Sequence, residues 1–189
     1  MHRLCEQHKK LFDRTLGVYP HNKFHIKVEK GSKPKHSRPY AVPQVHLETF
    51  VEELQHLAEL GVLEPQGTNE WASPTFIIPK KDSRVRWISD LRELNKCILR
   101  KEYSILIIND ILKKRKGYAF FSKLDISLQY YTFELDDESK DLCTIVTPFG
   151  KYRYRRLPMG LKCSPDYAQE VMENIYFVIS KTLMFTLTT

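Results

Sequence analysis

The sequence predicts a mixed α+β domain in which antiparallel strands pack against helices. Segments with helical spacing and segments with strand-like alternation occur in the same chain, without the regular alternation of a parallel α/β protein. The 189 residues, 42% hydrophobic and 28% charged, have the size and composition of one globular domain. The same composition excludes a disordered tail, a collagen-like chain and a coiled-coil rod.

The N-terminal third combines an extended lead-in with one strong helix. Residues 1–45 are rich in Pro, His and Lys and weakly patterned, which predicts an extended, solvated segment. Apolar residues then recur at helical spacing until Gly61 ends the pattern, so we expect an amphipathic helix over 47–60. Its buried face should include Phe50, Leu54 and Leu57.

Two β-hairpins are expected after this helix. Residues 75–78 and 84–88 are β-type runs separated by a basic turn. Residues 143–146 and 152–155 flank a Pro-Phe-Gly turn. The other segments are expected, in chain order, to be a polar turn at 90–96, a helix at 105–116, a buried strand at 119–124, a strand at 130–135, an acidic turn or short helix at 136–141, and a helix that starts with Ser164 as N-cap and Pro165 in its first turn.

The charge balance favours an anionic partner. Thirty Lys and Arg against 23 Asp and Glu give a net charge of +7, and nucleic acid is the first class of partner to consider. A basic domain can equally be soluble without such a partner. The four cysteines lack metal-knuckle spacing, which argues against a zinc site. Four cysteines in a chain of this size are not a dense disulfide scaffold, which favours a reducing compartment. No apolar run approaches the ~20 residues of a membrane span.

Two segments are candidates for catalysis and nucleotide binding. Asp125 follows the apolar strand and precedes a polar turn, which suits a Mg²⁺ ligand, although an Asp that caps a turn gives the same pattern. Lys80, Lys81 and Arg86 lie at the tip of the first hairpin, where point charge and a guanidinium fork could hold a triphosphate. The alternative is a solvated hairpin tip.

A third segment is a candidate for nucleic-acid binding. Residues 151–156 interleave aromatic and basic side chains, a pattern that suits base stacking and phosphate contact. The alternative is a two-sided strand with one charged face.

Six motifs in order resemble one known family. They are Trp71-Ala72-Ser73-Pro74, Ile78-Pro79-Lys80-Lys81-Asp82 with Arg86-Trp87, Asp90-Leu91-Arg92-Glu93-Leu94-Asn95-Lys96, Phe121-Ser122-Lys123-Leu124-Asp125, Thr147-Pro148-Phe149-Gly150-Lys151-Tyr152, and Leu157-Pro158-Met159-Gly160-Leu161. From about Val45 to Tyr176 the chain resembles the reverse transcriptase domain of long-terminal-repeat retrotransposons of the Ty3/gypsy type. The resemblance implies the fingers and the first part of the palm of a polymerase.

The resemblance also implies a reaction and its partners. A primer 3′-OH attacks the α-phosphate of a dNTP on an RNA or DNA template, with two Mg²⁺ or Mn²⁺ ions held by carboxylates. Asp125 matches the first metal carboxylate, and Lys80 or Lys81 with Arg86 match the residues that grip the triphosphate. Tyr130 matches the aromatic residue whose ring excludes a 2′-OH.

Further residues take roles through the same resemblance. Met159 and Gly160 match the loop beside the nucleotide sugar, where a polar or aromatic residue is more usual than Met. Leu128-Gln129 replaces the Ser-Gly commonly seen before the aromatic residue. Contacts with nucleic acid are implied for Trp71, Arg92, Asn95, Lys151, Arg153 and Arg155. The family also implies an intracellular location, in the cytoplasm or nucleus, and no membrane partner.

The second metal motif of the family, Tyr-X-Asp-Asp, does not occur in the sequence. One carboxylate does not hold two metal ions, so we expect this chain neither to bind Mg²⁺ or Mn²⁺ stably nor to polymerise. A non-catalytic remnant that binds nucleic acid is the alternative function, and a structural interaction module has less support.

The tail suggests a reason for the missing motif. With a suitable choice of codons, a back-translation of residues 177–189 read one base out of frame gives R-D-I-E-D-V-D-V-Y-I-D-D, which ends in Tyr-Ile-Asp-Asp. We therefore expect a lead-in at 1–45, fingers and partial palm at 46–176, and a frameshifted tail at 177–189. An ordinary divergent C-terminus is the alternative.

Overall fold

The computed structural model describes residues 6–80 except 12 and 14, residues 85–104, residues 113 and 117, and residues 125–179. The expected helix at 105–116 and strand at 119–124 lie almost entirely outside these residues. In chain order the elements are η1 (Lys9–Leu11), η2 (Gln44–His46), α2 (Leu47–Glu59), β1 (Leu63–Pro65), β2 (Ser73–Pro79), β3 (Val85–Ser89), α3 (Arg92–Cys97), η3 (Gln129–Thr132), α5 (Asp137–Leu142), β4 (Thr144–Thr147), β5 (Gly150–Tyr154) and α6 (Ser164–Ile179).

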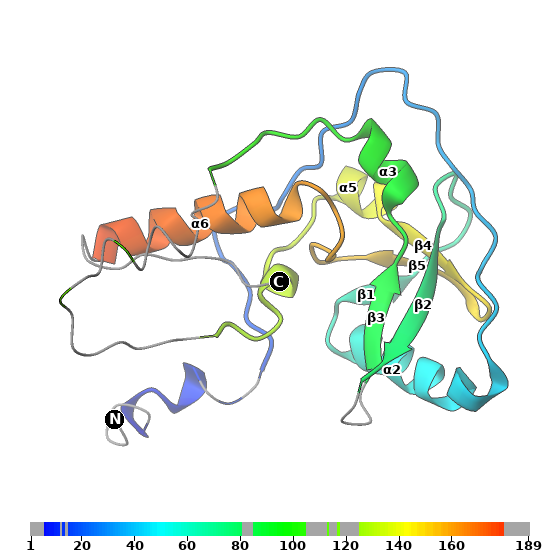
Figure 1. The fold of residues 1–189 in the computed structure, drawn as a ribbon, viewed down its shortest axis with the longest axis horizontal. Coiled ribbons are helices and arrows are strands. Elements are labelled where there is room, and N and C mark those ends of the chain that lie inside the picture. Colours follow the sequence, from blue (N-terminus) through cyan, green and yellow to red (C-terminus); the bar gives the residue numbers. More distant parts are fainter. Residues whose placement is uncertain are drawn as a thin grey trace.

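A five-stranded sheet in the order β1-β5-β4-β2-β3 forms the centre of the fold (Figure 1). Both predicted hairpins are confirmed, because β2 pairs antiparallel with β3 and β4 pairs antiparallel with β5. A short parallel pairing joins the hairpins, with Ser73 opposite Ile145 and Pro74 opposite Val146. Helices and a mainly antiparallel sheet confirm the predicted α+β class.

Helix α2 packs against this sheet through the apolar face that the sequence predicts. Phe50, Leu54 and Leu57 are at most 4% exposed. The Phe50 ring lies 4.9 Å from the ring of Trp87 on β3, measured between centroids. Burial of such large apolar side chains is the main stabilising term at this end of the molecule.

The lead-in is extended, as predicted, but it is not solvated throughout. Residues 19–38, here called the strap, run from the α6 side of the molecule to the sheet (Figure 1). Single bridges pair Phe24 with Leu135, Val28 with Ile98 and His36 with Ala72. The expectation was wrong because Phe24, Ile26 and Val28 alternate with polar residues, so that one edge of the strap turns inward and Ile26 is buried.

The polar turn expected at 90–96 is wrong, because this segment contains helix α3 (Arg92–Cys97). The Asp90 carboxylate accepts a hydrogen bond from the Arg92 N–H at 3.3 Å and so satisfies one of the free donors at the helix start. The N-cap itself is Leu91, which has no side-chain hydrogen bond, so the sequence carries no strong start signal at that position.

The strand expected at 130–135 is also wrong in its first half. Leu128 adopts a left-handed conformation with φ 53°, and the chain continues as the 3₁₀ turn η3. The Tyr131 N–H donates to the Leu128 carbonyl at 2.9 Å and the Phe133 N–H donates to that of Tyr130 at 3.1 Å. These N–H groups bond within the turn and so cannot pair with a neighbouring strand, and extended backbone resumes only at Phe133.

Two short predictions concern helix starts. The acidic segment at 136–141 forms α5, and Asp136 caps it by accepting the Ser139 N–H at 2.9 Å. Helix α6 begins at Ser164 itself, whose hydroxyl donates to the Pro158 carbonyl at 2.9 Å, so Ser164 is not the N-cap that the sequence suggests.

In the part of the chain that the structure describes, no helix combines the length and apolar content needed to cross a bilayer.

Candidate nucleotide and nucleic-acid site

The β2–β3 hairpin presents the predicted triphosphate-binding cations to solvent. Lys80 directly follows β2, and Arg86 lies on β3 opposite Ile78. Both side chains are exposed, and neither forms an ion pair among the described residues. Because strand residues alternate between faces, Arg86 points outward while Trp87 and Ser89 are buried. Lys81 lies outside the described residues.

Buried hydroxyl groups tie this hairpin to the rest of the sheet. Ser89 Oγ lies 3.1 Å from Thr75 Oγ1 and 2.8 Å from the Tyr154 hydroxyl, which also accepts the Trp87 Nε1–H at 3.1 Å. Burial raises the pKa of Tyr154 to about 12, so the phenol stays neutral and keeps its hydrogen bonds. The sequence analysis did not find this cluster, because its members come from three different strands.

Asn95 fastens the loop that contains Met159 and Gly160. Its Nδ2 donates to the Gly160 carbonyl at 2.7 Å, and its Oδ1 accepts the Lys162 N–H at 2.9 Å. Gly160 has φ 97°, and a Cβ placed there would lie 3.8 Å from the Ser89 carbonyl oxygen. The loop therefore lies beside the end of β3, with Met159 exposed, and the Asn95 amide is engaged by protein backbone.

Asp125 and Tyr130 lie on the segment that precedes and includes η3. Asp125 is exposed, and Tyr130 is half-buried, which raises the pKa of its phenol. Asp125 fits as one oxygen ligand for a divalent metal. Within the described ranges, no three or more His, Cys, Asp or Glu side chains come together to hold a metal ion.

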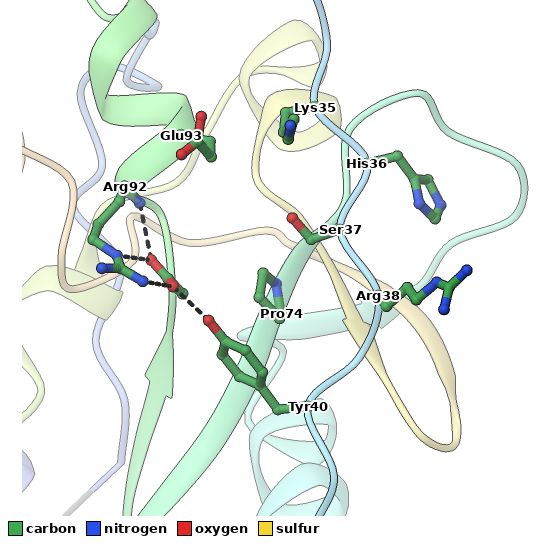
Figure 2. Close-up of a pocket in the computed structure, with 9 residues that line it drawn as sticks. Lys35, His36, Ser37, Arg38, Tyr40, Pro74, Arg92 and Glu93 are labelled. Atoms are coloured by element: carbon green, nitrogen blue, oxygen red, sulfur yellow. Dashed lines mark hydrogen bonds and ion pairs between the residues drawn. The ribbon is translucent and has the colours of Figure 1, made fainter.

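Arg92 lines a cavity of about 350 Å³ between the strap and the sheet (Figure 2). Its guanidinium donates to both oxygens of Asp90, at 2.8 and 2.6 Å, and the Tyr40 hydroxyl donates to the same carboxylate at 2.8 Å. These donors hold the pKa of Asp90 far below its usual range. The Arg92 side chain remains 80% exposed and so is fixed in place without being covered.

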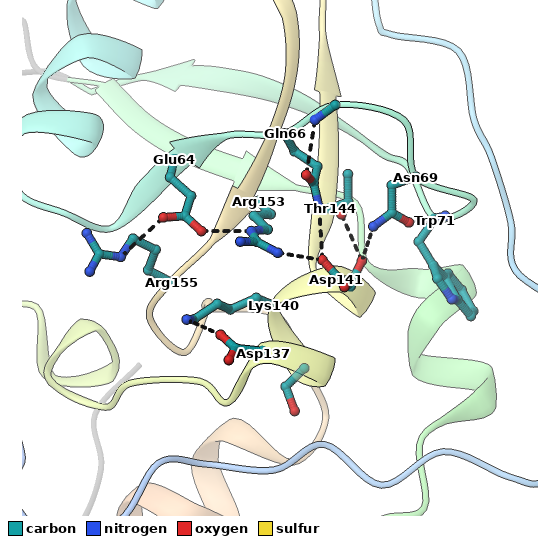
Figure 3. Close-up of polar contacts among 12 residues, drawn as sticks. Glu64, Gln66, Asn69, Trp71, Asp137, Lys140, Asp141, Thr144, Arg153 and Arg155 are labelled. Carbon is teal, nitrogen blue, oxygen red and sulfur yellow. Dashed lines mark hydrogen bonds and ion pairs between the residues drawn. The ribbon is translucent and has the colours of Figure 1, made fainter.

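The other predicted nucleic-acid residues make contacts within the protein (Figure 3). Arg153 pairs with Glu64 and Asp141, both at 2.7 Å, and Arg155 lies 3.4 Å from Glu64. Hydrogen bonding to Asp141 raises the pKa of Arg153. Lys151 Nζ donates to the Asn69 carbonyl at 3.2 Å, and Trp71 is buried.

Comparison with known proteins identifies the class. Residues 78–188 match the family model described as "Reverse transcriptase (RNA-dependent DNA polymerase)". The chain belongs to this family. More particularly, it corresponds to the fingers and part of the palm of the reverse transcriptase domain in a retrotransposon or retroviral Pol polyprotein. The match passes residue 176, and the division at 176/177 stays a prediction.

The relatives are much longer than this chain. It is 32% identical over 149 residues to the retrovirus-related Pol polyprotein from transposon 412 of Drosophila melanogaster, which covers 76% of this chain and 12% of that protein. The corresponding protein from transposon 297 of the same species is 28% identical, with coverage of 80% and 15%. The enzymatic polyprotein of Cauliflower mosaic virus (strain CM-1841) is 26% identical, with coverage of 82% and 23%.

Solved structures show the same fold. A crystal structure of the prototype foamy virus protease-reverse transcriptase matches with a TM-score of 0.85 and 20% identity, over 97% of this chain and 25% of that chain. The foamy viral protease-reverse transcriptase in complex with RNA/DNA hybrid matches with a TM-score of 0.80 and 17% identity, over the same shares.

Proposed function

We propose that the chain is the fingers and first part of the palm of a Ty3/gypsy-type RNA-directed DNA polymerase. In the intact parent, this unit extends a primer 3′-OH with dNTPs on an RNA or DNA template. The observation that carries the proposal is the β2–β3 hairpin, which holds Lys80 and Arg86 exposed and without an ion pair among the described residues while buried contacts fix its inner face. Cations that are already in place suit a polyphosphate.

The site residues take the following proposed roles. Lys80, Lys81 and Arg86 bind the triphosphate, and the loop at Met159 and Gly160 lies beside the sugar. Tyr130 closes the space that a 2′-OH would need. Asp125 supplies one ligand to Mg²⁺ or Mn²⁺, which in the parent neutralises charge on the phosphates.

Contact with the template-primer falls to Arg92 and, beside their role toward the triphosphate, to the exposed cations of the β2–β3 hairpin. Arg92 is 80% exposed although it pairs with Asp90, and Arg155 is also exposed, whereas Lys151 and Arg153 are half-buried against neighbouring protein groups and Asn95 holds a loop. We expect the latter residues to act through the shape of the fingers. An intracellular location follows from the same proposal.

A second candidate is a nucleic-acid-binding remnant without catalysis. The absence of Tyr-X-Asp-Asp from the sequence favours it for this polypeptide. We propose that a one-base frameshift near residue 176 accounts for that absence, so the two candidates describe the parent and the present chain.

Salt-dependent binding to a labelled RNA/DNA hybrid tests the nucleic-acid partner. We expect the affinity of the full chain to fall at least about tenfold between about 50 and 200 mM NaCl, because phosphate contacts release counterions. The Lys80→Gln/Arg86→Gln variant should bind more weakly at low salt. A Lys96→Gln/Lys101→Gln control, which removes two ion-paired lysines, should bind within about twofold of wild type. Affinity that is independent of salt would contradict the proposal.

A further inference from the structure

The strap gathers exposed positive charge, although Lys23 lies within electrostatic range of Asp137 and Lys35 within range of Glu93. Its Lys and Arg residues are all exposed, and none forms an ion pair among the described residues. They are Lys23, Lys27, Lys30, Lys33, Lys35 and Arg38. The only acidic residue between 19 and 38 is Glu29.

Cations on other surfaces differ, because many of them are paired. Lys96 lies 2.7 Å from Glu93, Lys101 3.2 Å from Glu170 and Lys140 2.6 Å from Asp137. Arg92, Arg100 and Arg153 are likewise paired with carboxylates. Among the described residues, the strap therefore carries six cations against one acidic residue, a net charge of +5.

The strap backbone is held in place along its length. The Phe24 N–H donates to the Glu134 carbonyl at 2.7 Å, the Leu99 N–H to that of Lys27 at 2.7 Å, and the Ser37 N–H to that of Ala72 at 2.9 Å. Buried Ile26 anchors the inner edge. An ordered backbone lowers the entropic cost that its cations pay on binding a partner.

Between its ends, where Val18 and Tyr40 are exposed, the strap offers little apolar surface that a protein partner would cover. All of residues 19–38 are described, and none of their large hydrophobic side chains is exposed. Protein interfaces are built around an apolar core, whereas nucleic-acid interfaces are strongly cationic. The chemistry therefore favours a polyanion whose charges repeat along a chain.

We propose that the strap is a second nucleic-acid contact surface, separate from the β2–β3 hairpin, which binds the phosphodiester backbone of a strand. This inference rests on the proposed function only in taking nucleic acid as the partner. It requires neither dNTP binding nor catalysis, and it assigns a binding role to a segment that the sequence suggests is only a lead-in.

Two variants with the same net charge test the proposal. In the strap variant Lys27, Lys30 and Lys33 are changed to Gln. In the control Lys9, Lys96 and Lys101 are changed to Gln, each of which lies in an exposed ion pair. Both triples lower the net charge from +7 to +4. The strap backbone hydrogen bonds do not involve the altered side chains, so both variants should keep the fold. Circular dichroism is used to check this.

The readout is the slope of log affinity against log salt for a fluorescein-labelled 16-nucleotide oligo(dT). Each phosphate contact on a single strand contributes about −0.7 to this negative slope. The magnitude of the slope should therefore decrease by about 2 in the strap variant and by less than about 0.5 in the control. Equal slopes for the two variants overturn the strap proposal even if wild type binds with steep salt dependence. Failure of wild type to bind oligo(dT) or hybrid overturns the proposed function as well. Strap-dependent binding of polyglutamate at the same strength as oligo(dT) would also overturn the proposal, by assigning the strap to acidic polypeptides.

Discussion

Leu128 shows how one residue decides the local path of the chain. It is the only described residue other than Gly with a positive φ, 53°, and its side chain is 45% exposed. The left-handed conformation costs an L-residue roughly 1–2 kcal/mol because Cβ crowds the following carbonyl. The hydrogen bonds of the surrounding turn offset this cost, and the conformation of Leu128 places Tyr130 in η3.

Substitution of Leu128 by Gly should stabilise the protein. Relief of the left-handed strain exceeds the entropy that Gly loses on folding, so we expect the free energy of unfolding to rise by about 0.5–1 kcal/mol. Urea denaturation followed by circular dichroism measures the change. Leu99→Gly is the matched control, since Leu99 is also exposed but has negative φ, and it should lower the free energy by a similar amount. The same sign for both variants would show that φ at residue 128 carries no strain.

At the scale of elements, a cluster of polar contacts fixes helix α6 to the segment that follows α3. Arg100 donates to both oxygens of Asp166, at 2.7 and 3.1 Å, and the Tyr103 N–H donates to the same carboxylate at 3.2 Å. The Tyr103 hydroxyl donates to Glu173 one and a half to two turns further along α6, at 2.8 Å. Asp166 is buried, so these contacts are shielded from water on the helix side.

The Asp166 contacts predict how stability depends on pH. Burial acts to raise the pKa of Asp166, but the hydrogen bonds from Arg100 and Tyr103 outweigh it, and the pKa lies below its ordinary value. Stability from this group is therefore fully present above the unfolded pKa of about 4 and is lost as the pH falls through the lower folded pKa.

Asp166→Asn should lower the free energy of unfolding by about 1–3 kcal/mol at pH 7, less than for a fully buried pair because Arg100 is partly exposed. Denaturation between pH 7 and 3 should also show a smaller loss for the variant than for wild type. Glu170→Gln, which removes a surface pair, should change the value by less than about 0.5 kcal/mol. An equal acid loss in wild type and Asp166→Asn would contradict this account.

Local periodicity predicted the elements whose apolar pattern is strong. Helix α2 and both hairpins follow from spacing and turn residues within a few positions of each other. Helix α3 was missed because its N-cap, Leu91, carries no strong start signal, and the turn at Leu128 because a single backbone conformation decided it. The parallel β2–β4 pair joins residues far apart in sequence, which periodicity does not report.

Prediction of the site was limited in a similar way. Residue type and turn signals indicated a basic hairpin with Lys80 and Arg86, both of which are exposed, but they did not indicate which cations elsewhere have carboxylate partners. Arg153 and Arg155 lie near Glu64, and Asn95 meets Gly160, only after the chain has folded. The strap was missed because its apolar alternation spans only Phe24 to Val28.

At the scale of the whole molecule, the sheet and helices form one part of a polymerase. The chain spans between 12% and 25% of the longer relatives and solved structures described above. Its sheet holds the β2–β3 hairpin and the Gly160 loop side by side, and Asp125 lies on the segment before η3. The sheet that holds the hairpin and the loop is therefore present, whereas Tyr-X-Asp-Asp does not occur in the sequence.

Primer extension tests that central claim most directly. Three polypeptides are compared on a labelled primer with an RNA template, dNTPs and Mg²⁺ or Mn²⁺: residues 1–189, the same chain with the shifted frame restored and the downstream palm and thumb added, and that restored protein with Asp125→Asn. We expect synthesis from the restored protein alone, because paired metals ~4 Å apart need carboxylates on both sides. Extension by residues 1–189, or by the restored protein with Asp125→Asn, would contradict this expectation.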